Sequence, residues 1–262
     1  SLRVDALAGW PVELRPGAFD DRPDDRQSLA GLYATVAAGP LATDLYWLRF
    51  VDRDAVFTDA AGREQRQSFG VRLFGTAGRL HGNVEGVPQT GQVGGNDIEA
   101  WTVAIEVTAD LAADGTLAAG VRADLASGDR RPGDGTLGTF NALYPNPTYF
   151  SQAALVYPAN LVDVHPFVRW QPTRRLQLTL EGDWLWRHRR RDGFYIQPLE
   201  PVAVATDAGR RIGWQAGVCA ELLLSANWSV QAWLVRFDGG SALAAAGLRD
   251  VDYGAGSVTF RF

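Results

Sequence analysis

The stretch Leu176-Gln-Leu178-Thr-Leu180-Glu-Gly182-Asp-Trp184-Leu-Trp186 decides the fold. Large apolar residues stand at every second position, apart from one glycine, and polar or acidic residues stand between most of them. In an extended chain the apolar side chains therefore share one face and the polar ones the other. A helix of this sequence would scatter its acidic residues around the axis. The stretch predicts a β-strand with one apolar face.

The same alternation recurs along much of the chain. Apolar residues alternate with polar or small ones in residues 101–108, 162–170, 212–224 and 257–262. No segment shows the 3.6-residue periodicity of an amphipathic helix. The sequence therefore predicts an all-β protein.

The connections between these strands alternate in length. Short polar turns are expected at 39–43, 76–78, 112–115, 171–174 and 225–227, and long loops at 15–27, 52–65, 87–95, 127–159, 187–210 and 238–251. About twelve strands of roughly 10–14 residues remain, which is longer than ordinary strands and suits a tilted membrane-spanning strand. We therefore expect a single-domain transmembrane antiparallel up-and-down β-barrel over residues 1–262. An even strand number places both termini on one side and lets the first and last strands pair.

A soluble sandwich would show the same alternation with the apolar face buried. Three features favour a membrane instead: strand length, the alternating connections, and aromatic residues near strand ends. The expected aromatic girdles contain Trp10, Tyr46, Trp170, Trp184, Trp186, Trp214 and Trp228.

Composition narrows the remaining classes. The chain has 262 residues with 25 basic and 30 acidic side chains, and every basic residue is arginine. The net charge of -5 speaks against nucleic acid as a partner. The single cysteine, Cys219, excludes an internal disulfide. The sequence contains no methionine, so we expect a mature or trimmed product.

If the apolar face meets lipid, the other face lines a lumen. The residues expected to line it and contact a solute are Arg3, Arg49, Arg72, Glu106, Arg122, Asp124, Asp163, Arg169, Glu181, Asp183, Arg187 and Arg261, with Asp5 and Glu221 beside them. Arginine binds carboxylate or phosphate in a forked geometry, so such a lumen suits an anionic solute. The alternative is that these charges only neutralise one another inside a narrow barrel.

The segment 122–195 resembles the C-terminal half of the alginate-export family of outer-membrane porins. The residues that carry the resemblance include Gly138-Thr-Phe140-Asn141, Pro158-Ala-Asn160-Leu-Val-Asp163-Val-His165-Pro166 and Asp192-Gly-Phe-Tyr195. The ending Val258-Thr-Phe260-Arg-Phe262 is similar to the C-terminal signal of outer-membrane barrels. The resemblance implies a bacterial outer-membrane channel for an anionic polysaccharide. The best-known members have eighteen strands, so a shortened or truncated member with a narrower lumen is implied here.

Several other functions remain open at this stage. The long loop 127–159 could close the pore of a structural or adhesive barrel, and Glu181 with Asp183 could serve a barrel hydrolase. The acidic residues Asp20, Asp21, Asp24 and Asp25 could recruit Ca²⁺ or form a solvated loop.

The partners follow from the porin hypothesis. We expect a monomeric channel in contact with the lipid bilayer, an anionic saccharide as solute, and no catalytic residues, metal or cofactor. The basic run 187–191 is expected at the outer rim, where it could contact lipopolysaccharide phosphates or an emerging polyanion.

Overall fold

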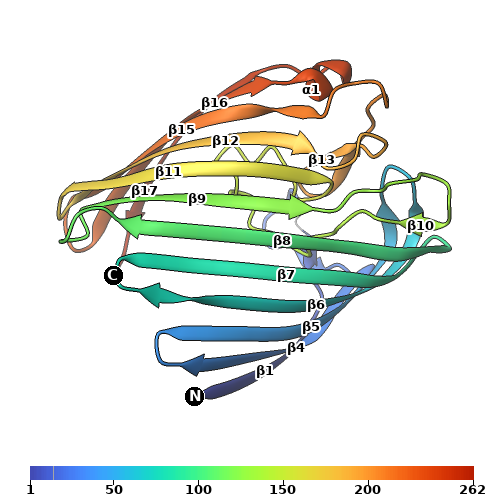
Figure 1. Cartoon of the computed structure of the whole chain (residues 1–262), viewed down its shortest axis with the longest axis horizontal. Helices are drawn as coiled ribbons and strands as arrows, with labels where there is room; N and C mark the ends of the chain where they lie inside the picture. Colours follow the sequence, from blue (N-terminus) through green and yellow to red (C-terminus); the bar gives the residue numbers. More distant parts are fainter. Residues whose placement is uncertain (14) are drawn as a thin grey trace.

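One long antiparallel sheet dominates the computed structural model, which describes residues 1–13 and 15–262. Its strands follow one another in chain order as a meander (Figure 1). They are β1 (Leu2–Gly9), β4 (Gln27–Ala38), β5 (Leu41–Val56), β6 (Ala61–Ala77), β7 (Leu80–Val93), β8 (Asn96–Asp110), β9 (Leu117–Ala126), β11 (Leu161–Thr173), β12 (Leu176–Arg187), β15 (Arg211–Leu223), β16 (Trp228–Gly239) and β17 (Val251–Phe260). The prediction of an all-β, antiparallel up-and-down fold with about twelve long strands is confirmed.

Small elements decorate the loops. A two-residue strand β10 (Thr136–Leu137) adds to the edge of β8, and two short hairpins stand apart from the main sheet. These hairpins are β2 (Val12–Glu13) with β3 (Arg22–Pro23), and β13 (Phe194–Ile196) with β14 (Glu200–Val202). One short helix, α1 (Ser241–Ala245), lies between β16 and β17. Within the described residues, no helix combines the length and the apolar character needed to cross a bilayer.

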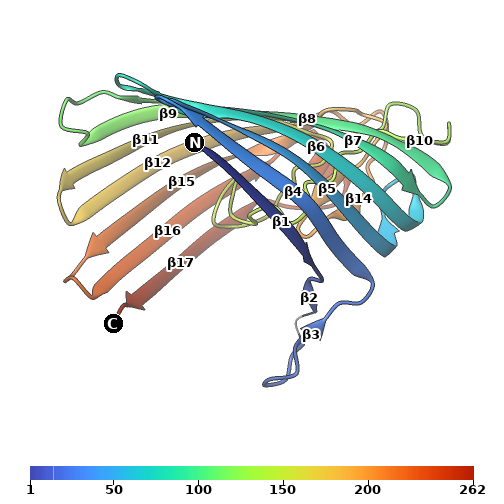
Figure 2. The ribbon, with the colours of Figure 1, turned by 90° about the horizontal axis from the view of Figure 1, so that it is seen from below.

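The sheet curves, and its two faces carry different chemistry. The convex, outer face exposes large apolar side chains, among them Leu180, Val218 and Leu234, which are 60%, 36% and 64% exposed. The concave, inner face carries polar side chains and is partly filled by loops (Figure 2). A soluble sandwich would have buried the apolar face instead. The outward apolar belt is what contact with lipid requires.

On β5–β8 the belt covers only part of each strand. On β8 the outward positions read Val107, Ile105, Val103 and Trp101 from the turn end, and then change to Glu99 and Asp97. The outward positions of β5, β6 and β7 change from apolar to mainly polar at the same height. These four strands therefore continue past the belt, and we call this part the polar extension of β5–β8.

The polar extension corrects two expected loops. Residues 52–65 and 87–95 lie mostly in strands, since β5 ends at Val56, β6 begins at Ala61 and β7 ends at Val93. Gly94 and Gly95 alone form the turn into β8, with the positive φ angles that such a tight hairpin turn uses. The backbone ladder holds these strands, although their outward side chains lack the apolar alternation from which strands were predicted.

The other connections agree with the alternation of lengths. Short turns join β4 to β5, β6 to β7, β8 to β9, β11 to β12 and β15 to β16, all at one end of the sheet, the turn end. Long loops at the opposite, loop end cover residues 127–160, 188–210 and 240–250. Both chain termini lie at the turn end (Figure 1).

The edges of the sheet are β1 and β17. Among the described residues, β1 pairs only with β4 and β17 only with β16, and the two edges stand apart in Figure 2. The pairing of the first strand with the last, which the even strand number allows, is therefore not seen in the described part of the chain.

One member of the predicted girdles is misplaced. Trp170, Trp184 and Trp228 lie exposed on the outer face. Tyr46 instead points inward, where its ring stacks on Tyr33 at 5.3 Å between centroids and its hydroxyl donates to Glu85 at 2.7 Å.

A pair of substitutions on β8 tests the belt. Replacing Ile105, inside the belt, by arginine places a charge against lipid and is expected to lower the free energy of unfolding by about 2–4 kcal/mol. Glu99→Arg changes an outward position of the same strand in the polar extension and is expected to cost less than about 1 kcal/mol. Denaturant unfolding in lipid vesicles measures both. Equal losses would contradict the assignment of the belt to lipid.

Candidate functional site

The inner face gathers most of the predicted lumen residues on four neighbouring strands. Cross-strand register places Glu106 of β8 opposite Arg122 of β9, and Asp124 of β9 opposite Asp163 of β11. The remaining members of this group on β11 and β12 are Arg169, Glu181 and Asp183. All seven share the inner face, which follows directly from strand alternation.

Arg122 lies at the centre of this group. Its guanidinium is 3.9 Å from Glu106 and 4.0 Å from Glu181, and its Nη2 donates to His165 Nε2 at 3.2 Å. The rings of Tyr149 and Phe167 lie at 5.3 and 5.6 Å from the guanidinium carbon. Arg122 is therefore held by carboxylates and by aromatic faces.

His165 belongs to the same inner-face group. It lies within β11, is 1% exposed, and faces Arg122, Glu181 and Asp183. The alternating pattern of residues 162–170 already places it beside Asp163 on the inner face.

Three inward carboxylates lie below the accessible surface. Asp124, Asp163 and Asp183 are 8%, 1% and 1% exposed. Asp124 accepts from the Tyr149 hydroxyl at 3.2 Å, and Asp183 accepts from Gln215 Nε2 at 2.9 Å. In the described residues no three His, Cys, Asp or Glu side chains are arranged to hold a metal ion. Because all three are buried, these carboxylates belong to the packed wall.

Residues 138–150 cross the inner face, and we call this segment the strap. At one end Gln89 of β7 donates to the Asn141 carbonyl at 2.7 Å, and Arg66 of β6 donates to the Thr139 carbonyl at 3.2 Å. At the other end Arg122 donates to the Tyr149 carbonyl at 2.8 Å.

Two further hydrogen bonds carry the strap to distant strands. Gln215 of β15 donates to the Phe150 carbonyl at 3.1 Å, and the Tyr144 hydroxyl donates to Gln27 of β4 at 2.9 Å. The strap thus spans the concave side from β4 to β15.

Gln89 was absent from the expected site because residues 87–95 were expected to form a loop, and Arg66 directly follows the other expected loop, 52–65. Arg66 is fully buried, with Glu64 as its ion-pair partner and Gln89 Oε1 accepting from it at 2.6 Å. If the strands had been predicted over their full lengths, the alternation of faces would have placed both residues on the inner face.

Cavities border the strap on two sides. The one beneath it, of about 240 Å³, lies against the inner face of β5–β8, with Glu85, Gln89 and Asp124 in its wall. The larger one, of about 850 Å³, lies at the loop end between the strap and the β13–β14 hairpin, with Asp52 and Glu200 in its wall.

Arg187 has a different role from the one expected of a lumen residue. It is fully buried, and its guanidinium donates to the carbonyls of Arg190, Asp192, Ala208 and Gly209 at 3.0–3.1 Å. Arg187 therefore holds the loop 188–210 in place and is not available to a solute.

The remaining predicted residues divide between the faces. Arg3 and Arg72 point inward, where Arg3 pairs with Asp5 at 2.8 Å and Arg72 lies 3.7 Å from Asp44. Arg261 follows the last strand at the turn end.

Arg49 contradicts the expectation, because the register places it with Leu45 on the outer face. It lies just past the apolar belt, where a charged side chain can reach water.

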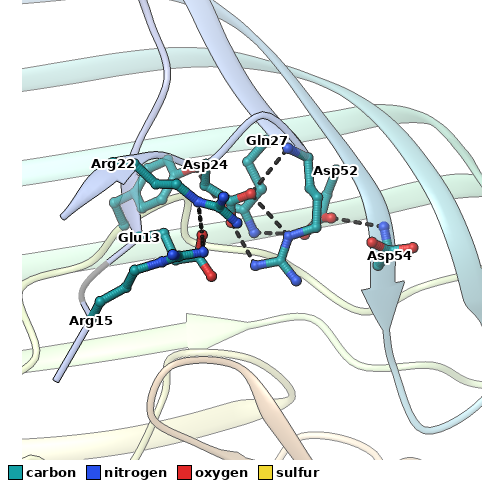
Figure 3. Close-up of polar contacts among 9 residues, drawn as sticks. Glu13, Arg15, Arg22, Asp24, Gln27, Asp52 and Asp54 are labelled. Atoms are coloured by element: carbon teal, nitrogen blue, oxygen red, sulfur yellow. Dashed lines mark hydrogen bonds and ion pairs between the residues drawn. The ribbon is translucent and has the colours of Figure 1, made fainter. Parts of the chain in front are cut away.

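Local ion pairs and hydrogen bonds hold acidic side chains near the N-terminus (Figure 3). Glu13 pairs with Arg22 at 2.8 Å, Asp24 pairs with Arg26 at 2.8 Å, and Asp52 accepts from Gln27 at 2.7 Å. Asp20 and Asp21 accept from backbone N–H groups of Gly17 and Arg15.

A buried carboxylate ties the long loops together. Asp192 accepts from the backbone N–H of Asp129 at 2.9 Å, from the Thr139 hydroxyl at 2.6 Å and from the Tyr195 hydroxyl at 3.0 Å. We call these four residues the loop clasp. Burial raises the pKa of Asp129 to about 6, and burial also raises the pKa of Asp192.

Asp129→Asn tests the buried carboxyl of Asp129, because the backbone N–H that donates to Asp192 is retained in the variant. An unfolded aspartate titrates near 3.9, so Asp129 stabilises the closed loop fully below about pH 4 and loses this contribution as the pH rises through about 6. At pH 7.5 the variant should therefore raise the free energy of loop opening by about 1–3 kcal/mol, with little change at pH 3.5. Hydrogen exchange of residues 127–160 measures this difference.

His188 provides the contrast for this experiment. Burial lowers its pKa to about 4, and its Nδ1 accepts from the Gly128 N–H at 3.3 Å. The contribution of His188 to the free energy of loop opening is present above about pH 6.5 and is lost as the pH falls through about 4. This pH dependence is opposite in sign to that of Asp129. An unchanged pH profile in Asp129→Asn would contradict the role given to Asp129.

Gln89→Ala tests the strap. The change leaves polar groups of Arg66 and Asn141 without partners, which costs about 1–3 kcal/mol for each buried group. We expect faster hydrogen exchange in residues 138–150. Gln92→Ala, an exposed change on the same strand, is the matched control and should leave the exchange unchanged.

Comparison with known proteins places this geometry in a family. A family model described as alginate export matches residues 1–256, which confirms the resemblance seen in 122–195 and extends it over nearly the whole chain. A comparison with curated protein sequences finds no match.

Solved structures agree on the fold. OccK5 (OpdH) of Pseudomonas aeruginosa has a TM-score of 0.57 and 12% identity, over 100% of this chain and 68% of that chain. OccK11 (OpdR) of the same organism has a TM-score of 0.51 and 13% identity, over 100% of this chain and 77% of that chain. CdiB from Acinetobacter baumannii has a TM-score of 0.53 and 11% identity, over 88% of this chain and 42% of that chain. At these identities the similarity concerns the fold.

Proposed function

Because the chain belongs to the alginate export family of bacterial outer-membrane proteins, we propose that it passes a polar, anionic saccharide through the space enclosed by its inner face. In such barrels the short turns are periplasmic and the long loops extracellular. The strap and the loop clasp then lie toward the cell exterior.

The observation that carries the proposal is the contrast between the two faces of one sheet. The outer face exposes an apolar belt to lipid, while the inner face presents Arg3, Arg72, Arg122 and Arg169 among carboxylates. A water-filled space beside fixed charges favours charged, hydrogen-bonding solutes. Arginine supplies the forked contact that a sugar carboxylate needs.

The strap sets the width of the passage. It crosses the inner face from β4 to β15 and leaves a cavity of about 850 Å³ on its extracellular side. A solute would pass between the strap and the uncovered part of the wall, so the strap acts as the constriction in this proposal.

The same strap supports a second candidate, a structural barrel with a closed pore. Its anchors Arg66 and Gln89 are buried, and such anchors resist displacement. Conductance separates the two candidates.

We propose no catalytic chemistry for the inner face. Asp183 is 1% exposed and bonded to Gln215, while Glu181 Oε2 lies 3.4 Å from His165. A glycosidase pair needs both carboxyl groups open to the sugar. The arrangement instead supports a wall that binds an anionic saccharide and guides it through the enclosed space.

Two partner assignments remain part of the proposal. Arg189, Arg190 and Arg191 are exposed on the loop 188–210, where they suit lipopolysaccharide phosphates. We also propose a monomeric channel.

Planar-bilayer recording tests the proposed function. The purified protein should conduct, and a linear tetrauronate should interrupt the current more often than the neutral tetrasaccharide cellotetraose at equal concentration. Absence of any conductance would favour the closed barrel. Equal interruption by both sugars would contradict selection for anions.

A further inference from the structure

A row of inward side chains crosses the inner face near the turn end. The register aligns Arg169 of β11 with Thr179 of β12, Thr179 with Cys219 of β15, and Cys219 with Trp233 of β16. Ala118 and Ala255 flank the row on β9 and β17. Because directly opposed residues in a sheet point to the same face, all four side chains face the enclosed space.

Arg169 is the cation of this row. Its guanidinium carbon lies 5.8 Å from the centre of the Phe167 ring, and the side chain is exposed. Among the described residues, no carboxylate oxygen lies within 4.0 Å of it, whereas Arg3, Arg72 and Arg122 each have such a partner. Arg169 therefore keeps its donors for an incoming anion.

Trp233 is the aromatic surface of the row. The adjoining Leu234 is 64% exposed on the outer face, so alternation turns Trp233 inward, where it is half-buried. A tryptophan in this position cannot anchor the protein at the lipid interface. Its neighbours across the sheet are Cys219 and Ala255, both small, which leaves the indole face uncovered by them.

The strap does not reach this row. Its contacts with the wall end at Arg122 and Gln215, which lie nearer the loop end of their strands. Both ribbon views show the part of the concave face next to the turns clear of loops (Figures 1 and 2). Arg169 is exposed and the other three side chains of the row are half-buried, so the row is accessible to a solute from the periplasmic side.

We propose that Arg169, Thr179, Cys219 and Trp233 form a binding shelf for an acidic oligosaccharide, an inference that rests on the proposed function. Arg169 binds a sugar carboxylate, and the apolar face of a neighbouring sugar ring stacks on Trp233. Three strand spacings separate the two residues, roughly 14 Å, so the shelf spans a short oligosaccharide and not a single sugar.

The single cysteine reports on the shelf directly. Cys219 is half-buried between Thr179 and Trp233, and the chain has no other thiol. A water-soluble methanethiosulfonate reagent should modify it in the reconstituted protein, and saturating tetrauronate should slow modification at least fivefold. Cellotetraose should protect less. A thiol that resists modification, or that tetrauronate leaves unprotected, would overturn the shelf.

Substitutions separate the two contacts. Arg169→Ala and Trp233→Ala should each raise the tetrauronate concentration needed for half-protection of Cys219 by about tenfold. Arg169→Lys should retain part of the affinity because it keeps the charge, and Trp233→Phe should do so because it keeps a ring. The matched controls Arg49→Ala and Trp228→Ala change outer-face residues and should behave as the unmodified protein does.

The outcomes distinguish the shelf from the channel function. If tetrauronate interrupts the current of the unmodified protein but the shelf variants bind it equally well, the shelf is wrong and the proposed function stands. If tetrauronate neither interrupts the current nor protects Cys219, both fail. Protection of Cys219 without conductance would support the shelf in a closed barrel.

Discussion

The structure depends on one constraint, which is that a bilayer offers no hydrogen-bond partner to a peptide backbone. A sheet satisfies its N–H and C=O groups between strands, so the backbone pairing in turn fixes which side chains face lipid. The apolar belt takes one set of alternate positions. The charged residues of the spanning strands must then occupy the other set, on the concave face.

Several inward charged side chains hold loops or are packed below the surface. Arg66 and Arg122 hold the strap, Arg187 holds the loop 188–210, and Asp124 and Asp183 are hydrogen-bonded below the surface. Buried charges need such partners, because an unpaired one would carry a large desolvation cost. The interior is therefore better described as a charged wall that positions loops than as a channel lined by free arginines.

Sequence alternation predicted the parts of the fold in which the two faces differ strongly. On β8, β11, β12 and β15 the apolar and polar sets are distinct, and the faces came out as expected. On β5 both faces are apolar, since Tyr46, Leu48 and Phe50 are inward and Leu45 and Trp47 are outward. Charge was the remaining cue there, and it placed Arg49 on the wrong face.

Long-range contacts lay beyond that reasoning. The strap depends on hydrogen bonds such as Arg122 to Tyr149 and Gln215 to Phe150, which join residues 27 and 65 positions apart. No local pattern encodes such a pairing. Likewise, Arg187 was expected in the lumen because strand alternation places it on the inner face. The loop 188–210 covers it there and removes it from solvent.

The polar extension of β5–β8 carries ordered backbone beyond the hydrocarbon. Its tips, residues 57–60 and 94–95, are mounted on hydrogen-bonded strands and not on long flexible connections. Paired strands of this kind hold the outermost residues of the extension at a fixed height above the headgroups. On this flank of the sheet the outward side chains are therefore presented to water from a fixed backbone.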